Sequence, residues 1–328
     1  MSTLGGSTMH TTGTQTKESQ PKKSIRSILF GITDSPIFQS GCRNISDPYP
    51  TSTETPSETP DSRPFMSIVM TCNGVDRQDL SVALMSVVAQ TCWDFELVFS
   101  SPLSSECDHV EGFLSESSFH YTVSKSDKIR TRSERFAHAC GLAKGRWIAV
   151  LDADDILHPD AVWTMYRILK QNQLFNVFCG SHIVFNNKFE KLGINLAAPV
   201  AQMCESLKHS FKQRHFWGFR NEPSRFPERI LVTTYPVEDY IFFCKLALEG
   251  TPVLHIPHAL YAWRLHSLQW TQASKEECQS MCKTIQRYMV FQMKQKSPMF
   301  AWGDMALAAR LTDNMVRIEK SIPIGGDA

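Results

Sequence analysis

Short apolar runs separate longer amphipathic segments between residues 65 and 155. The runs are Met66–Met70, Phe95–Phe99, Phe119–Val123 and Trp147–Leu151. Runs of this length, rich in branched and aromatic side chains, are typical of strands buried on both faces of a sheet. The sequence therefore predicts four core strands in this part of the chain.

The segments between these strands carry apolar residues at helical spacing. One predicted helix buries Leu80, Leu84, Val87 and Val88, and another, over about 131–144, buries Phe136, Cys140 and Ala143 and is stopped by Gly145. Strands that alternate with helices predict an α/β fold with a Rossmann-like, mostly parallel sheet flanked by helices. Ligands of such sheets bind beyond the carboxyl ends of the strands.

The second half of the chain shows a more mixed pattern. Strand-like pieces lie near Val177–Phe185 and Pro252–Trp263, and a helix is predicted from about Val237 to Glu249. We expect residues 65–271 to form one domain. Residues 272–328 are predicted to be a C-terminal helical extension packed on it, because their apolar positions follow a helical period.

Residues 1–64 differ in composition from the rest of the chain. They are rich in Ser, Thr, Pro and Gly and are predicted to be disordered, because they bury too little apolar surface to offset the entropy of ordering. Residues 21–33 leave two interpretations open. One is a short basic amphipathic helix that makes a peripheral membrane or partner contact, and the other is a transient helix within the tail.

Composition narrows the class of protein. With 42% hydrophobic residues and a net charge of +1 over 328 residues, the chain lacks the basic excess typical of nucleic-acid binders, so no nucleic-acid partner is expected. The ten cysteines form no CxxC pair, which argues against a zinc ribbon and fits a reducing compartment. There is neither a spanning run of about 20 apolar residues nor a signal peptide. We expect a cytoplasmic protein.

Three carboxylates follow the fourth predicted strand. Asp152, Asp154 and Asp155 come directly after Leu151. Clustered carboxylates repel one another, and a hard divalent cation relieves that repulsion, so the pattern predicts a site for Mn²⁺ or Mg²⁺. A helix cap is the alternative interpretation, although a cap requires only one aspartate.

Four stretches of the chain, in the same order, resemble the motifs of family 2 glycosyltransferases. They are Ser67–Asn73 (continued by Leu84–Thr91 and Phe95–Val98), Ala143–Asp155, Val237–Tyr240 and Leu260–His266. The resemblance implies a GT-A fold and a metal-assisted, inverting transfer of a sugar. The implied donor is a nucleotide-sugar, with a UDP-sugar expected first, and the implied acceptor is a carbohydrate, glycolipid or polymer.

The resemblance also implies roles for individual residues. Asp239 would be the general base, with Glu238 orienting it or sharing its role. The donor would be bound by Thr71 and Asn73 of the first loop, by Asp152 of the metal motif, and by Arg264 and His266 of the closing segment, which would hold the diphosphate. The Arg-Asn pair that the family usually carries in the helix before the metal motif is absent, and Arg132, one of the nearest basic residues, is the expected donor-binding residue there. For Glu238 and Asp239 the alternative is that they complement the dipole of the helix that they open.

The chain departs from the family pattern where the nucleotide base would lie. Cys72 stands where an aromatic residue usually precedes the Asn of the first loop. Ser100 and Ser101 stand where a carboxylate usually follows the second strand. The departures fit a second hypothesis, a catalytically inactive GT-A-like binding or scaffold module. A nucleotidyltransferase ranks last, because no Gly-rich, Lys-containing loop follows the first strand.

A basic and aromatic segment, Lys208–Arg220, lies between the metal motif and Asp239. In the family this region faces the acceptor, so Trp217 and Arg220 are the expected acceptor-binding residues. The alternative is a loop packed by its own aromatic side chains.

Overall fold

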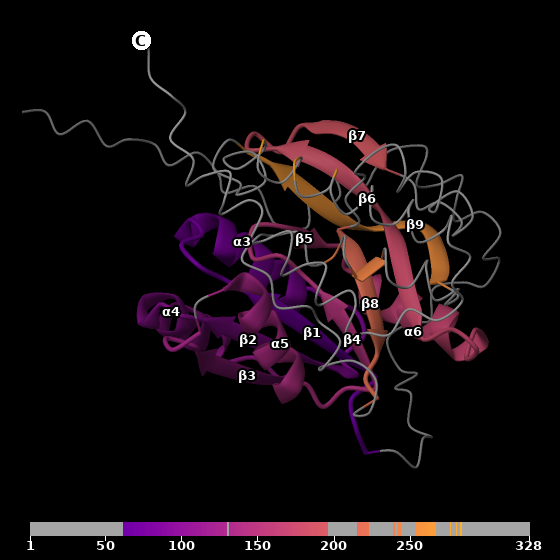
Figure 1. Cartoon of the computed structure of the whole chain (residues 1–328), viewed down its shortest axis with the longest axis horizontal. Coiled ribbons are helices and arrows are strands. Elements are labelled where there is room, and N and C mark those ends of the chain that lie inside the picture. Colours follow the sequence, from indigo (N-terminus) through magenta and orange to yellow (C-terminus); the bar gives the residue numbers. More distant parts are fainter. Residues whose placement is uncertain are drawn as a thin grey trace, which may run out of the picture.

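A computed structural model of the protein describes residues 62–129, 131–195, 215–222 and 253–266, together with Asp239, Phe242, Phe243, Glu276, Ser280 and Lys283. These residues form an α/β fold around one curled sheet (Figure 1). Nearly all of the predicted tail and of the predicted C-terminal extension lies outside the described residues, as does most of the helix expected at 237–249.

Four parallel strands form one half of the sheet, in the order β3-β2-β1-β4. They are β1 (Met66–Thr71), β2 (Phe95–Ser101), β3 (His120–Lys125) and β4 (Trp147–Val150). Each coincides with a predicted strand to within two residues at either end, and β1, β2 and β4 are almost wholly buried, as their apolar runs predict. The α/β fold with a mostly parallel sheet is confirmed.

Helices cover both faces of this half. α3 (Arg77–Val88) and α4 (Ser104–Leu114) pack on each other, whereas α5 (Arg132–Leu142) packs against β1 and β2. The β3-to-β4 connection runs back across the sheet, so right-handed crossovers place α5 on the face opposite α3 and α4. α6 (Ala161–Gln171) follows the loop after β4. Neither α4 nor α6 was among the predicted helices.

Two details of the predicted helices need correction. Val88, expected on the buried face of α3, is 43% exposed, because it is the last helical residue. α5 ends at Leu142, and Ala143 is already extended. Gly145 therefore has another role. A Cβ at this position would overlap the backbone of Ser67 in β1, so only glycine allows the chain to enter β4 beside β1.

The second half of the sheet adds strands of varied length and mixed direction. They are β5 (Ile156–Leu157), β6 (Val177–Asn186), β7 (Lys191–Asn195), β8 (Phe216–Arg220) and β9 (Val253–Leu265). β8 lies antiparallel between β4 and β6, and β9 lies parallel to β6. Phe216–Arg220, in the segment for which an acceptor-facing surface and a loop were both open, thus form a central strand. In β8, Gly218 crosses so close to Ile148 that a Cβ would overlap its carbonyl.

This topology gathers four chain segments at one edge of the sheet. β1 and β4 end there, and because β8 is antiparallel to β4, β8 begins there. The carboxyl end of β9 reaches the loop that follows β4, where β9 pairs with β5 (Figure 1). This edge also holds the acidic motif.

Five of the cysteines in the described part are buried free thiols: Cys72, Cys92, Cys107, Cys140 and Cys179. Burial raises the pKa of the Cys140 thiol far above its ordinary value, so this thiol is unreactive in the folded state. Among the described residues, no helix has the length and apolar character needed to cross a membrane.

Candidate functional site

The loop after β4 is fixed by side chains of β9. Asp155 is 1% exposed. Its Oδ1 accepts the backbone N–H of Arg264 at 2.7 Å, and its Oδ2 accepts the hydroxyl of Tyr261 at 2.6 Å. The Tyr261 oxygen in turn accepts the backbone N–H of Asp152 at 3.2 Å. These bonds hold the acidic loop against β9 and set the direction of both carboxylates.

The carboxylate of Asp155 is electrostatically unfavourable where it lies. Burial, and then the neighbouring charges of Asp154 and Asp152, raise its pKa well above the ordinary value for aspartate. Two hydrogen bonds to its oxygens lower the pKa, but they offset the rise only in part. A divalent cation at this position would favour the ionised form and remove the repulsion.

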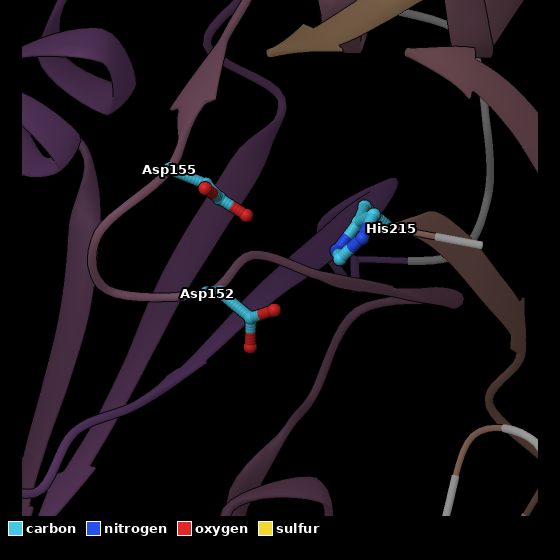
Figure 2. A group of neighbouring side chains, drawn as sticks. All are labelled: Asp152, Asp155 and His215. Atoms are coloured by element: carbon cyan, nitrogen blue, oxygen red, sulfur yellow. The ribbon is translucent and has the colours of Figure 1, made fainter. Parts of the chain in front are cut away.

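His215 completes a group of three potential metal ligands with Asp152 and Asp155, whose ligand atoms all lie within 4.8 Å of one another. The β4–β8 register pairs Trp147 with Arg220 and Ala149 with Gly218. Continued past the end of β4, this register places His215 opposite Asp152. Figure 2 shows the imidazole and the two carboxylates turned toward the same space.

The imidazole of His215 is buried and incompletely bonded. It is 7% exposed, and its Nε2 has no hydrogen-bond partner among the described residues. Burial, together with His182 and Arg132, lowers its pKa well below the ordinary histidine value. The ring is therefore neutral, which is the form that binds metals. One imidazole nitrogen and two carboxylates fit a divalent ion such as Mn²⁺.

Asp154 points to a different neighbour. Its Oδ2 lies 2.9 Å from Nε2 of His266, and both side chains are partly exposed. The three aspartates predicted as one metal-binding set therefore divide in the structure. Asp152 and Asp155 face His215, and Asp154 is paired with His266 at the end of β9. His266, expected to bind the donor, does lie at the acidic loop.

Arg132 is a cation in contact with the ligand group. It stands at the first position of α5, behind a capping box formed by Thr131 and Glu134, and its guanidinium is 2.7 Å from Oδ1 of Asp152. The side chain is 39% exposed, so it remains accessible to an anion. The structure thus brings Arg132 to the acidic motif, although the family's usual Arg-Asn pair is absent from this helix.

Arg264 is placed differently from the implied diphosphate-binding position. Its side chain is 2% exposed and forms an ion pair with Asp79 of α3 at 2.9 Å. The guanidinium lies over the rings of Phe185 and Phe189, and its Nε donates to the backbone oxygen of Asp154 at 2.8 Å. The physical reason for this correction is burial: Arg264 ties β9 to α3 and to the acidic loop and does not face solvent.

The first loop lies beside the end of β2. Thr71 is the last residue of β1 and pairs with Ser100, and Asn73 is exposed two residues later. Both therefore stand at the edge where β4 ends. Cys72 between them is buried, and burial, followed by the charge of Glu106, raises the pKa of its thiol.

Glu106 of α4 is a residue that the sequence analysis missed. Its Oε1 accepts the backbone N–H groups of Gly74 at 2.7 Å and Val75 at 3.2 Å, and its Oε2 accepts the hydroxyl of Ser101. A carboxylate thus does lie at the end of β2, although neither strand residue supplies it. Gly74, with φ of +79°, makes the turn that presents these amides.

Trp217 and Arg220 do not join the other predicted site residues. Trp217 is 5% exposed, and its ring packs on Phe136 of α5 and on Phe242 and Phe243. Arg220 pairs with the first residue of β4, which puts it about 17 Å along β8 from His215 at 3.4 Å per residue. Burial and strand direction therefore correct the acceptor-binding assignment of both residues.

We expect Trp217→Ala to destabilise the domain by about 3–5 kcal/mol, because it leaves a cavity between β8, α5 and the segment of Phe242. Urea denaturation followed by circular dichroism measures this change. Trp93→Ala is the control, since Trp93 is 56% exposed and its loss should change stability by less than about 0.5 kcal/mol. Equal small effects in both variants would contradict the packing role.

Asp239 is helical and half-buried, whereas Glu238 lies outside the described residues. Asp239 precedes Phe242 by three positions, so the two side chains share a helix face. Phe242 packs on Trp217 at 5.0 Å, and Trp217 also packs on Phe136, one turn after Arg132 in α5. One ring therefore joins the helices that carry Asp239 and Arg132.

Comparison with known families finds a match over more than half of the chain. The sequence profile of the family described as "Glycosyl transferase family 2" matches residues 67–246. A curated relative, described as an uncharacterized glycosyltransferase of Methanocaldococcus jannaschii, is 24% identical over 113 residues. That alignment covers 34% of this chain and 39% of the relative, so it spans well under half of either protein.

Solved structures with a similar fold include a mannosyltransferase and a protein bound to UDP-GlcNAc. The mannosyltransferase PcManGT of Pyrobaculum calidifontis, in complex with GDP-Man and Mn²⁺, is 11% identical with a TM-score of 0.52, over 92% of this chain and 87% of that one. TarS 1-349 of S. aureus, in complex with UDP-GlcNAc, is 12% identical with a TM-score of 0.53, over 78% and 73%. At this identity the likeness concerns the fold.

Proposed function

This chain belongs to glycosyl transferase family 2, and we propose that it transfers a sugar from a nucleoside-diphosphate donor to an acceptor hydroxyl, with inversion at the anomeric carbon. One observation carries the proposal. The edge of the sheet where this family's acidic motif lies holds Asp152 and Asp155 beside a buried, neutral imidazole, with Arg132 close by. Two carboxylates that repel each other do not stabilise the fold, so a purely structural edge would not be expected to hold them.

A diphosphate is the donor group that best complements this edge. Mn²⁺ or Mg²⁺ bound at the acidic corner would neutralise negative charge on the departing nucleoside diphosphate. Arg132 offers paired N–H donors to phosphate oxygens. Because its side chain is partly exposed, it can leave its ion pair with Asp152 and bind these oxygens instead. The similar folds bound to GDP-Man with Mn²⁺ and to UDP-GlcNAc support a nucleotide-sugar donor.

Thr71, Asn73 and His266 complete the proposed donor site. Asn73 is exposed beyond β1, where its amide can bond the nucleoside. Glu106 does not read the base, because both its oxygens are already bonded to the first loop and to Ser101. It is a positioning residue that keeps the loop in place. We therefore assign the donor only as a nucleoside-diphosphate sugar, with uridine as the first nucleoside to test.

Asp239 is the proposed general base. As the acceptor oxygen bonds to the anomeric carbon, Asp239 takes the hydroxyl proton, and the bond from that carbon to the diphosphate oxygen breaks. The aromatic packing that joins the helix of Asp239 to β8 and α5 supports its place on the same side of the sheet as Arg132. Glu238 retains its proposed role of orienting or sharing the base.

The acceptor is proposed as a carbohydrate, glycolipid or polymer hydroxyl, without contacts from Trp217 or Arg220. The alternative that the sequence left open, an inactive scaffold module, is not favoured by the match to the glycosyltransferase family. The two functions differ in whether the protein binds a nucleotide-sugar, because a scaffold has no reason to bind one.

A panel of UDP- and GDP-sugars, each with Mn²⁺ and each with chelator, tests the proposal by thermal denaturation. A true donor at 100 times its dissociation constant stabilises the protein by about 2.7 kcal/mol, and this stabilisation should require the metal. Incubation of that donor with oligosaccharide acceptors then reports the transferred sugar and its anomeric configuration. Absence of stabilisation by every nucleotide-sugar and every nucleoside diphosphate would favour the scaffold.

A further inference from the structure

The edge of the sheet opposite the acidic loop carries a row of exposed apolar and basic side chains. β2, β1, β4 and β6 begin at this edge, and β8, which is antiparallel to β4 and β6, ends there. The residues beside these strand ends therefore follow one another across the sheet. Trp93 stands at one end of the row, two residues before β2, and Leu174 stands at the other end, three residues before β6.

Trp93 and Leu174 are the two most exposed large apolar side chains in the described part of the chain, at 56% and 91%. Four strand spacings separate them, which corresponds to about 19 Å across the sheet. A single exposed apolar residue is ordinary on a protein surface and identifies no partner. The charge that lies between these two residues is what distinguishes them.

Two arginines occupy the middle of the row. Arg146 directly precedes β4, and Arg220 is the last residue of β8. Their neighbouring carboxylates are distant, because Arg146 lies 3.8 Å from Asp94 and Arg220 lies 4.0 Å from Glu222, and ion pairs of this kind at partly exposed positions contribute little. Both guanidinium groups thus remain available to another anion. Arg220 also donates to the backbone oxygen of Gln173 at 2.9 Å, which brings the end of α6 to this edge.

Three further cations flank the arginines. Arg63 precedes β1, Lys144 precedes β4, and Lys170 lies in the last turn of α6, and all three are exposed. The described part of this edge therefore holds five cations beside two partly exposed carboxylates, although the whole chain has a net charge of only +1. These five cations, together with Trp93 and Leu174, form the basic edge.

We propose that the basic edge is a docking surface for an anionic lipid bilayer. Trp93 and Leu174 enter the interfacial layer, and the cations between them bind lipid phosphates. Tryptophan is enriched where proteins meet the membrane interface, and clustered lysines and arginines are attracted to anionic headgroups. An acidic polypeptide would complement the cations alone, whereas a bilayer also accommodates the exposed apolar side chains at both ends of the row.

Docking by the basic edge leaves the candidate site open to solution. The parallel strands run from the basic edge toward the acidic loop, and Trp147 at the start of β4 lies about 17 Å from Asp152 at 3.3 Å per residue. The proposal therefore does not depend on sugar transfer. Variants at the basic edge should transfer sugar to a soluble acceptor at the wild-type rate.

Co-sedimentation of the full chain with lipid vesicles tests the proposal. Vesicles of phosphatidylcholine and phosphatidylglycerol in equal amounts should bind the protein, and vesicles of phosphatidylcholine alone should not. Added salt should weaken the binding, because it screens the charges. Lys144→Glu combined with Lys170→Glu should weaken it by about 25-fold or more, since each basic residue near an anionic surface strengthens binding by about fivefold.

A second double variant tests the apolar ends of the row. Trp93→Ala combined with Leu174→Ser should also weaken binding to the anionic vesicles, and what remains should be more sensitive to salt. In the wild type, brominated lipids should quench part of the tryptophan fluorescence, and Trp93→Phe should remove that part. All the substituted positions are exposed, so the fold should be retained, and circular dichroism checks this.

Matched controls lie away from the basic edge. Lys125→Glu combined with Lys128→Glu reverses two exposed charges at the carboxyl end of β3. Leu192→Ser removes an apolar side chain that is 52% exposed on β7. Both control variants should bind the anionic vesicles as the wild type does.

Three results would overturn the proposal. The first is absence of binding to the anionic vesicles. The second is binding that survives both double variants of the basic edge, which would assign the contact to another segment such as residues 21–33. The third is binding to soluble polyglutamate but to neither kind of vesicle, which would indicate an acidic polypeptide partner. Failure of sugar transfer in the wild type is read in the separate donor assay and leaves this test unaffected.

Discussion

Asp239→Asn should reduce the rate of sugar transfer by roughly 10²–10⁴-fold, because an amide cannot take the proton of the acceptor hydroxyl. Donor binding should be unchanged, since the substitution touches neither the acidic corner nor Arg132. The same size and shape preserve the helix face that Asp239 shares with Phe242. Initial rates at saturating donor measure the loss, and calorimetric titration of the donor measures the affinity.

Asp108→Asn is the matched control for this prediction. Asp108 is an exposed aspartate on helix α4, so its amide variant should transfer sugar at the wild-type rate. If Asp239→Asn retained more than about a tenth of the wild-type rate, a general-base contribution of the usual size would be ruled out. The carboxylate would then serve the helix end, the alternative that the sequence left open.

Asp152→Asn should abolish metal-dependent transfer, with a loss on the order of 10²–10³-fold, because a bound cation contributes several kcal/mol of charge stabilisation to the leaving group. The variant should also bind Mn²⁺ about 10- to 100-fold more weakly. Asp152 is partly exposed and its carboxylate bonds Arg132, so the fold should tolerate the change. Calorimetric titration of Mn²⁺ in the presence of UDP measures the affinity.

The affinity for Mn²⁺ should also fall as the pH is lowered. The raised pKa of Asp155 means that this carboxyl group holds its proton to a higher pH than an ordinary aspartate, and the metal must displace that proton.

Asp127→Asn, at an exposed position, is the control for Asp152→Asn and should bind Mn²⁺ as the wild type does. Wild-type affinity in Asp152→Asn would contradict the assigned ligand.

The parallel half of the fold could be predicted from sequence because each strand there is a compact apolar run. Met66–Met70 and Trp147–Leu151 are buried on both faces, so their composition alone distinguishes them from their surroundings. The acidic motif could be found for the same reason, since it directly follows such a run. Which of the three carboxylates face one another depends on the hydrogen bonds of Asp155 to β9. A contact between residues so far apart in sequence leaves no local pattern from which to predict it.

β8 was missed because its sequence resembles an exposed aromatic loop. Phe216-Trp217-Gly218-Phe219 continues from several basic residues, and basic aromatic segments are typical of ligand-binding surfaces. The glycine was the available signal, because a glycine within an apolar run marks a strand that passes close to another backbone. His215 could be found only once β8 was paired with β4, since the antiparallel register sets it opposite Asp152.

Arg264 and Glu106 show how burial changes the role of a charged residue. The family resemblance implies that the Arg–His pair at the end of β9 binds the donor diphosphate, yet the ion pair of Arg264 with Asp79 holds the guanidinium in the core. Glu106 is the opposite case. It lies on α4, a helix that was not predicted, and it places a carboxylate at the end of β2, where the two serines of the strand supply none. Sequence spacing identifies the groups present, and tertiary contacts decide which of them remain available to a ligand.

The most direct test of the account is a crystal of the protein with Mn²⁺ and UDP, examined by anomalous scattering at the manganese edge. The account predicts one strong anomalous peak beyond the end of β4, in contact with the acidic loop at Asp152 and Asp155 and next to the imidazole of His215. A nucleotide bound at the sheet edge without a peak there, or a peak coordinated elsewhere, would contradict it.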